Sequence, residues 1–200
     1  MKKLDKKIGD LRHALKQKKS DREMRYPFAR VTVTGGFVYA SDAHILFKAP
    51  AYNYIDDPAL IENKAIDFDT LAKISKAKNV ETDGEYLYID GARYNFSDEI
   101  KDRSYYKPGQ TGALVAEGTV PDFECVLPTR FGQSHSVIGI DIELLFRLSK
   151  CFRESVGMKL EFTEDRDNPT APRRAIKVTT VSATDFGEWG IIMPQTVNGQ

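Results

Sequence analysis

The chain has 200 residues, of which 41% are hydrophobic, 29% charged and 10% aromatic, and its formal net charge is zero. This composition is typical of a globular protein and excludes disordered, fibrous and collagen-like chains. No apolar run approaches the roughly 18 residues of a membrane span, and no apolar stretch follows the N-terminal lysines as in a signal peptide. Two cysteines are too few for a disulfide framework. We therefore expect a cytoplasmic protein with no membrane partner.

The charge is unevenly distributed along the chain. Residues 1–30 contain eleven lysines and arginines but four acidic residues, so this segment carries +7 and the other 170 residues carry −7. One basic element on an acidic body favours attraction to a polyanion on one side. The same pattern also fits a solvated helix face, which composition by itself favours.

Three segments have the apolar spacing of amphipathic helices. They predict helices over residues 4–19, from Asp69 as N-cap to about Lys78, and from Asp141 to Arg153. The apolar stripes consist of Leu4, Ile8, Leu11 and Leu15; of Phe68, Leu71, Ala72 and Ser75; and of Ile142, Leu145, Leu148, Ser149 and Phe152.

Short apolar alternations between turn residues predict antiparallel strands. Gly35-Gly36 and Asp90-Gly91 are two-residue hairpin signals. The expected strands are residues 31–34, 37–40, 45–47, 86–89, 92–96, 158–163, 175–180 and 188–193. Residues 49–64 and 97–119 are expected to be loops.

A weak internal repeat accompanies these elements. Residues 66–78, IDFDTLAKISKAK, resemble residues 138–152, IGIDIELLFRLSKCF, if two residues are inserted. In both, an apolar residue precedes Asp, a helix follows, and Ser-Lys lies near its end. The order of helix and strands, repeated, predicts an α+β architecture in which an amphipathic helix packs on antiparallel sheet.

Asp42 and His44 form an Asp-x-His pair, which can belong to a catalytic dyad or a metal site. No second cluster of ligands lies at metal-binding spacing, and no nucleophile elbow or phosphate-binding Gly-rich loop is present. A structural His is therefore favoured. Cys125 and Cys151 lie in apolar surroundings typical of core residues. We expect no catalytic residue, metal or cofactor, and a small hydrolase or metal enzyme centred on Asp42 and His44 is the alternative.

Three tyrosines, Tyr86, Tyr88 and Tyr94, fall on the adjacent strands of one expected hairpin. Such a group can stack bases of a single-stranded nucleic acid. Cross-strand aromatic pairs that stabilise a sheet are the commoner reason for this pattern, so both interpretations are open here.

Each expected helix opposes its apolar stripe with cations. Three basic helices on one side of a sheet would contact phosphates without reading sequence. The sequence therefore predicts duplex DNA as a non-specific partner. The candidate DNA-binding residues are Lys6, Arg12, Lys16, Lys73, Lys76, Arg147 and Lys150.

Three separated segments together resemble the bacterial DNA sliding clamps, the processivity subunits of replicative polymerases. Residues 31–50 resemble that family's strand-turn-strand, with Ser41 to Leu46 in place of its Thr-Asp-Gly-His-Arg-Leu segment. VPDFECVLP at 120–128 resembles its Phe-Pro-Asp-Tyr-x-x-Val-Leu-Pro connector, and GIIMPQ at 190–195 its Met-Pro ending. The resemblance implies a DNA-clamp-like fold.

In that family the three segments converge on an apolar pocket that binds short peptides of polymerases, clamp loaders and repair proteins. The resemblance implies a similar peptide-binding site here. Its residues would be His44, Ile45, Leu46, Pro128, Ile191, Ile192, Met193 and Pro194. Ala43 stands where the family has Gly and Ile45 where it has Arg, so a polar contact at the rim is lost.

The family's subunit has six helix-sheet modules and its closed ring twelve, whereas this chain has length for three. We expect a clamp-like domain of two modules at residues 1–128 and a partial module at 129–200, and a homo-oligomer is compatible with this arithmetic. The resemblance implies a non-enzymatic processivity or scaffold protein in DNA replication. A clamp-derived adaptor that binds peptides without encircling DNA is the alternative, favoured by the acidic body and the short chain.

Overall fold

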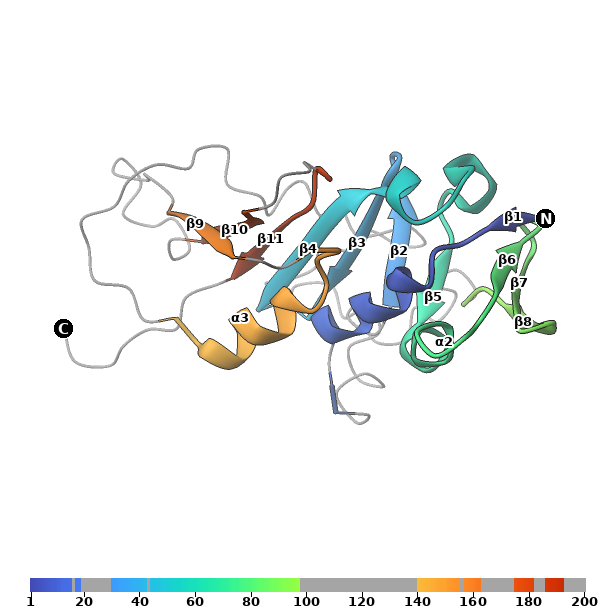
Figure 1. Ribbon diagram of the computed structural model, residues 1–200, viewed down its shortest axis with the longest axis horizontal. Coiled ribbons are helices and arrows are strands. Elements are labelled where there is room, and N and C mark those ends of the chain that lie inside the picture. The colour runs from blue at the N-terminus through green and yellow to red at the C-terminus, as the bar shows by residue number, and fades with distance from the viewer. Residues whose placement is uncertain are drawn as a thin grey trace, which may run out of the picture.

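The computed structural model of the chain has a mixed α/β architecture with two antiparallel sheets (Figure 1). The structure describes residues 1–15, 17–18, 30–42, 44–97, 140–154, 157–162, 175–181 and 186–192. The expected α+β class is confirmed at this level. Among the described residues, no helix is long and apolar enough to cross a membrane.

The larger sheet has seven strands in the order β5-β2-β3-β4-β11-β10-β9, all antiparallel. The strands are β2 (Arg30–Thr34), β3 (Phe37–Ser41), β4 (Ile45–Pro50), β5 (Ala65–Asp67), β9 (Met158–Phe162), β10 (Ile176–Thr180) and β11 (Trp189–Ile192). Leu46 pairs with Ile191 and Ile45 with Ile192 where β4 meets β11. The sheet therefore continues across the expected boundary between residues 128 and 129.

The smaller sheet has the order β1-β6-β7-β8, with β1 (Lys2–Lys3), β6 (Val80–Thr82), β7 (Tyr86–Ile89) and β8 (Ala92–Asn95). Two strands are exchanged between the sheets. β1, which precedes the first helix, pairs with β6, and β5, which precedes the second helix, pairs with β2. The segments β1 to β4 and β5 to β8 therefore have the same order of elements and interlock reciprocally.

The described residues contain three helices of seven residues or more: η1 (Lys6–Ala14), α2 (Phe68–Ile74) and α3 (Ile142–Ser149). Each follows an Asp N-cap whose carboxylate accepts a backbone N–H, at Asp5, Asp67 and Asp141. The expected bounds are thus corrected, since the second helix is capped by Asp67 and not by Asp69.

The first helix is a 3₁₀ helix and is shorter than the expected 4–19. Ile8, Leu11 and Ala14 are buried at intervals of three, the period at which side chains align in a 3₁₀ helix. Leu4 is buried in a bridge to Ile55, ahead of the helix. The apolar spacing therefore predicted the buried residues but not the helix type.

Both hairpin turns are confirmed. Gly35 and Gly36 have φ of 58° and 77°, and Asp90 and Gly91 have φ of 49° and 84°, as a type I′ turn requires. Residues 49–64 are more ordered than expected, because they contain the end of β4, two 3₁₀ turns, η3 (Ala51–Asn53) and η4 (Pro58–Ile61), and the isolated bridge at Ile55. The strands β1, β5 and β6 were not predicted, because they have only two or three residues each.

The internal repeat aligns without an insertion. Asp67 and Asp141 are both N-caps, which sets residues 66–78 against 140–152 and corrects the expected two-residue insertion. Ile74 and Leu148 then coincide, and both are fully buried in the main core. The Ser-Lys pairs, residues 75–76 and 149–150, coincide as well.

The three helices lie on one face of the larger sheet, with η1 between α2 and α3 (Figure 1). Alternate strand residues face them in one apolar cluster that both sheets share. Leu148 of α3 and Phe152, which follows the helix, are buried as expected. Leu145 is only partly buried, and Leu144, which was not placed on the buried side, is buried. Ile142 is 80% exposed, which corrects its placement on the buried side.

Candidate functional site

The candidate DNA-binding residues lie on the helix layer. Lys6 is exposed at the start of η1, and Lys73 is exposed on α2. Lys76 and Lys150 are exposed directly after α2 and α3. The ammonium of Lys73 lies 4.5 Å from the centre of the Tyr94 ring. Lys16 lies outside the described residues. Four of the seven expected residues are thus lysines whose side chains are exposed on or beside the helices.

Arg12, Arg147 and Lys150 meet around His13, where the end of η1 lies against α3. The Arg12 guanidinium donates to the carbonyl of Gly9 at 2.8 Å and to Asp10 Oδ1 at 3.3 Å. Burial, followed by the charges of Arg12 and Lys150, lowers the pKa of His13. His13 is therefore neutral at pH 7 within a cluster of cations.

Arg147 is directed into the protein. Its Nε donates to the carbonyl of His13 at 3.0 Å, and its Nη2 donates to the carbonyl of Leu15 at 2.9 Å and to Asp42 Oδ2 at 2.6 Å. Since these donors are engaged within the chain, we remove Arg147 from the expected DNA-facing set. Its structural effect is to tie α3 to the end of η1 and to the turn between β3 and β4.

Asp42 and His44 do not form a side-chain dyad. The Oδ1 atom of Asp42 accepts the backbone N–H groups of His44 and Ile45 at 2.8 and 2.9 Å, while His44 is exposed. The carboxylate thus closes the β3–β4 turn and pairs with Arg147. In the described part of the chain, no group of three His, Cys, Asp or Glu side chains is placed to hold a metal.

Two of the three segments expected to form the peptide site are adjacent, because β4 pairs with β11. Ile45 and Ile192 face the helices and belong to the main core, which corrects their placement in an exposed groove. Leu46 and Ile191 face the opposite side of the sheet, but are only 6% and 3% exposed. Pro128, Met193 and Pro194 lie outside the described residues.

Leu46 and Ile191 belong to a second apolar cluster on the sheet face away from the helices. Its other members are Tyr39 and Ala175, with Phe37 and Trp189 packed against it. The ammonium of Lys48 lies 4.2 Å from the Phe37 ring centre and 5.5 Å from that of Trp189. On that face the described strands therefore carry a buried aromatic cluster and not the expected exposed isoleucine groove.

The three tyrosines of the smaller sheet do not form one platform. Leu87 pairs with Tyr94, and Tyr88 pairs with Arg93, so Tyr86 and Tyr88 face the side of the sheet opposite to Tyr94. Tyr88 donates its hydroxyl proton to Asp83 at 2.8 Å. The tyrosines do not form cross-strand aromatic pairs either, because Tyr86 pairs with Asn95, Tyr88 with Arg93 and Tyr94 with Leu87.

A buried ionic network that the sequence did not predict joins the ends of the chain. Tyr54 donates to Glu188 Oε1 at 3.0 Å, the Arg153 backbone N–H donates to Glu188 Oε2 at 2.9 Å, and the Arg153 guanidinium pairs with Asp5 at 3.0 Å. Burial raises the pKa of Glu188, and the Arg153 N–H and the Tyr54 hydroxyl oppose this. The feature of the sequence that could have indicated this network is Glu188, an acidic residue directly before the last strand.

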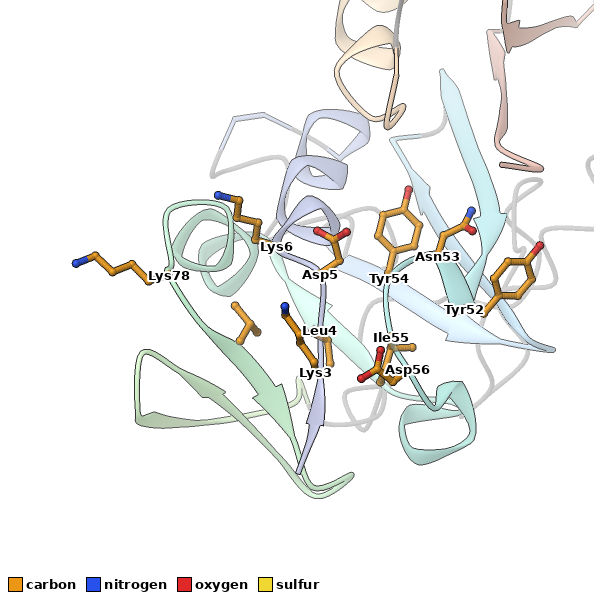
Figure 2. Close-up of a pocket in the computed structure, with 11 residues that line it drawn as sticks. Lys3, Leu4, Asp5, Lys6, Tyr52, Asn53, Tyr54, Ile55, Asp56 and Lys78 are labelled. Atoms are coloured by element: carbon orange, nitrogen blue, oxygen red, sulfur yellow. The ribbon is translucent and has the colours of Figure 1, made fainter. Parts of the chain in front are cut away.

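A cavity of about 410 Å³ lies where β1 leads into η1, opposite η3 (Figure 2). Its lining residues are Lys3, Leu4, Asp5, Lys6, Tyr52, Asn53, Tyr54, Ile55, Asp56, Lys78 and Val80. In Figure 2, Lys6 and Lys78 extend outward, away from the centre of the cavity. Since three lysines stand beside two aspartates, the lining favours neither an anion nor a cation.

Cys151 is fully buried, and burial raises the pKa of its thiol. It is therefore a core residue without thiolate character at neutral pH, as the sequence indicated. Cys125 lies outside the described residues.

Comparisons with protein-family models, with curated proteins and with solved structures found no match for this chain.

Proposed function

We propose that the protein is a non-enzymatic, DNA-clamp-like scaffold that holds duplex DNA against its helix layer through phosphate contacts. The observation that carries the proposal is the helix layer itself. η1, α2 and α3 lie on one face of one continuous antiparallel sheet. Exposed lysines lie on η1 (Lys6), on α2 (Lys73) and directly after α2 and α3 (Lys76 and Lys150). A duplex laid across such a layer would meet Lys6, Lys76 and Lys150 without any base contact.

The arrangement of the modules supports the same proposal. The reciprocal exchange of β1 and β5 joins two segments with the same order of elements, and the pairing of β4 with β11 extends the larger sheet beyond them. The sequence segments that resemble sliding clamps fall on β2 to β4 and on β11. Leu46 and Ile191, which were expected to line a peptide groove, are buried, so the proposal assigns no peptide-binding residue on the described strands.

Equilibrium binding to unrelated duplexes at several salt concentrations tests the DNA contact. About five phosphate contacts predict a slope of log affinity against log salt concentration near −4 to −5. The variant Lys76→Gln/Lys150→Gln should weaken binding and make this slope shallower by roughly 2. Absence of binding at low salt, or a slope near zero, would contradict the proposal.

A matched control removes the same charge from the other side of the sheet. Lys159 and Lys177 lie on β9 and β10, on the face away from the helices, and both pair with Glu161. Lys159→Gln/Lys177→Gln should therefore leave the slope unchanged. Equal losses in the two double variants would mean that only net charge matters.

The alternative is an adaptor that binds partner peptides without holding DNA. The internal engagement of Arg147 favours it, because one of the expected cations does not reach the helix surface. Saturable binding of a Gln-Leu-x-Leu-Phe peptide by a monomer that ignores duplex DNA would select the adaptor. A tetrameric native mass with DNA binding would select a ring.

A further inference from the structure

We infer that His13 is a proton-linked member of the anion-binding surface, so that binding of duplex DNA at the η1–α3 junction takes up a proton there. This inference rests on the proposed DNA contact and names a binding residue and a pH response that the sequence did not indicate. It starts from the position of His13 between two helices.

His13 is the point where cations from η1 and α3 converge. Arg12 precedes it on η1, Arg147 donates to its carbonyl, and the Lys150 charge acts on its ring from α3. The negative charge of Asp10 on η1 acts on the His13 pKa in the opposite direction. Asp42 forms an ion pair with Arg147. His13 is partly exposed to solvent.

The acidic partners of this cluster are already engaged. Asp10 accepts from Arg12 and pairs with Lys7, at 3.3 and 3.5 Å, and Asp42 is engaged by Arg147 and two backbone N–H groups. Lys150, whose ammonium lies 4.4 Å from the Phe146 ring centre, is exposed. A phosphate at this junction would thus add the negative charge that the cluster lacks.

The direction of the pH response follows from this environment. In the free protein, burial and the neighbouring cations hold the pKa of His13 below its usual value, so the ring is neutral at pH 7. A bound phosphate offsets those cations and favours the imidazolium, which raises the pKa. Because the complex then binds more protons than the free protein, affinity for DNA must rise as pH falls.

The test is the dissociation constant of an unrelated duplex for the full chain from pH 8 to pH 6 at constant ionic strength. One linked proton predicts an affinity gain of about threefold or more over this range, with a limit of tenfold per pH unit. His13→Gln should remove most of the gain. His44→Gln changes another histidine, exposed on the β3–β4 turn, and should retain it.

An NMR titration of the His13 ring, with and without duplex, provides a readout on the unaltered protein. The pKa of the ring should be higher in the complex. Binding with the same pH dependence in His13→Gln and wild type, or an unchanged pKa, would overturn the inference while the proposed DNA contact stands. Failure to bind at any pH, even at low salt, would overturn the proposed function and this inference together.

Discussion

The helices α2 and α3 occupy equivalent places in the two segments that resemble each other. At one equivalent position, however, the side chain is exposed in one helix and buried in the other. Lys73 of α2 is exposed and lies over the Tyr94 ring. Arg147, its counterpart on α3, is mostly buried and holds Asp42 and two carbonyls of η1. The comparison teaches that neighbours in space, and not the repeat pattern, assign a cation to the surface or to an interface.

Arginine suits the buried position because its planar group can donate to three acceptors at once, whereas an ammonium on a flexible stem suits the exposed one. The groups that surround the two side chains differ as well. α3 lies beside the buried carboxylate of Asp42, whereas Lys73 meets an aromatic ring of the smaller sheet.

The largest expected effect tests this difference directly. Arg147→Met should lower the free energy of unfolding by about 3–5 kcal/mol, because it leaves the buried carboxylate of Asp42 without its counter-charge. Lys73→Met, the matched change on α2, should stay within about 0.5 kcal/mol. Chemical denaturation of both variants measures the two effects, and comparable losses would show that the two positions do not differ energetically.

Each of the two helices packs closely against a glycine, and the two contacts differ in a second, smaller way. A Cβ at Gly9 would lie 2.5 Å from the backbone nitrogen of Ser75 and 2.6 Å from the carbonyl oxygen of Leu71 on α2, while one at Gly190 would meet the Leu148 side chain of α3 at 2.6 Å. Gly9→Ala should cost about 3 kcal/mol and Gly190→Ala about 1–2 kcal/mol, because a side chain can turn aside but helix backbone cannot.

Thermal unfolding of the two alanine variants, each against wild type, checks this order. If Gly190→Ala proves the more damaging, then Leu148 is held more rigidly than the backbone of α2. The expected order of the two losses of stability would then be wrong.

The N-caps give the smallest expected difference. The bonds that the Asp67 carboxylate accepts from the N–H and hydroxyl of Thr70 and from the hydroxyl of Ser97 are partly buried, whereas the bond that Asp141 accepts from the N–H of Glu143 is exposed to solvent. Asp67→Ala should therefore cost about 1–2 kcal/mol and Asp141→Ala about 0.5–1 kcal/mol. Urea denaturation resolves the difference, and a larger loss for Asp141→Ala would contradict it.

Features governed by residues close in sequence could be predicted from the sequence alone. The turns at Gly35-Gly36 and Asp90-Gly91 need residues that accept positive φ, and the apolar spacing of α3 predicted the burial of Leu148 and Phe152. The exposure of Lys73, Lys76 and Lys150 opposite the apolar stripes was predicted on the same basis. The exposed positions of these three lysines were thus determined by local periodicity.

The tertiary structure decided the rest, because it depends on residues distant in the chain. The pairing of β4 with β11 places Ile45 and Ile192 in the core and leaves Leu46 and Ile191 on the other face, and periodicity cannot choose the partner of a strand. The exposure of Ile142 and the inward course of Arg147 are likewise set by where α3 meets η1 and the β3–β4 turn. A side chain's spacing fixes the face of the helix on which it lies, but a buried charge takes its position from the partner that the fold brings to it.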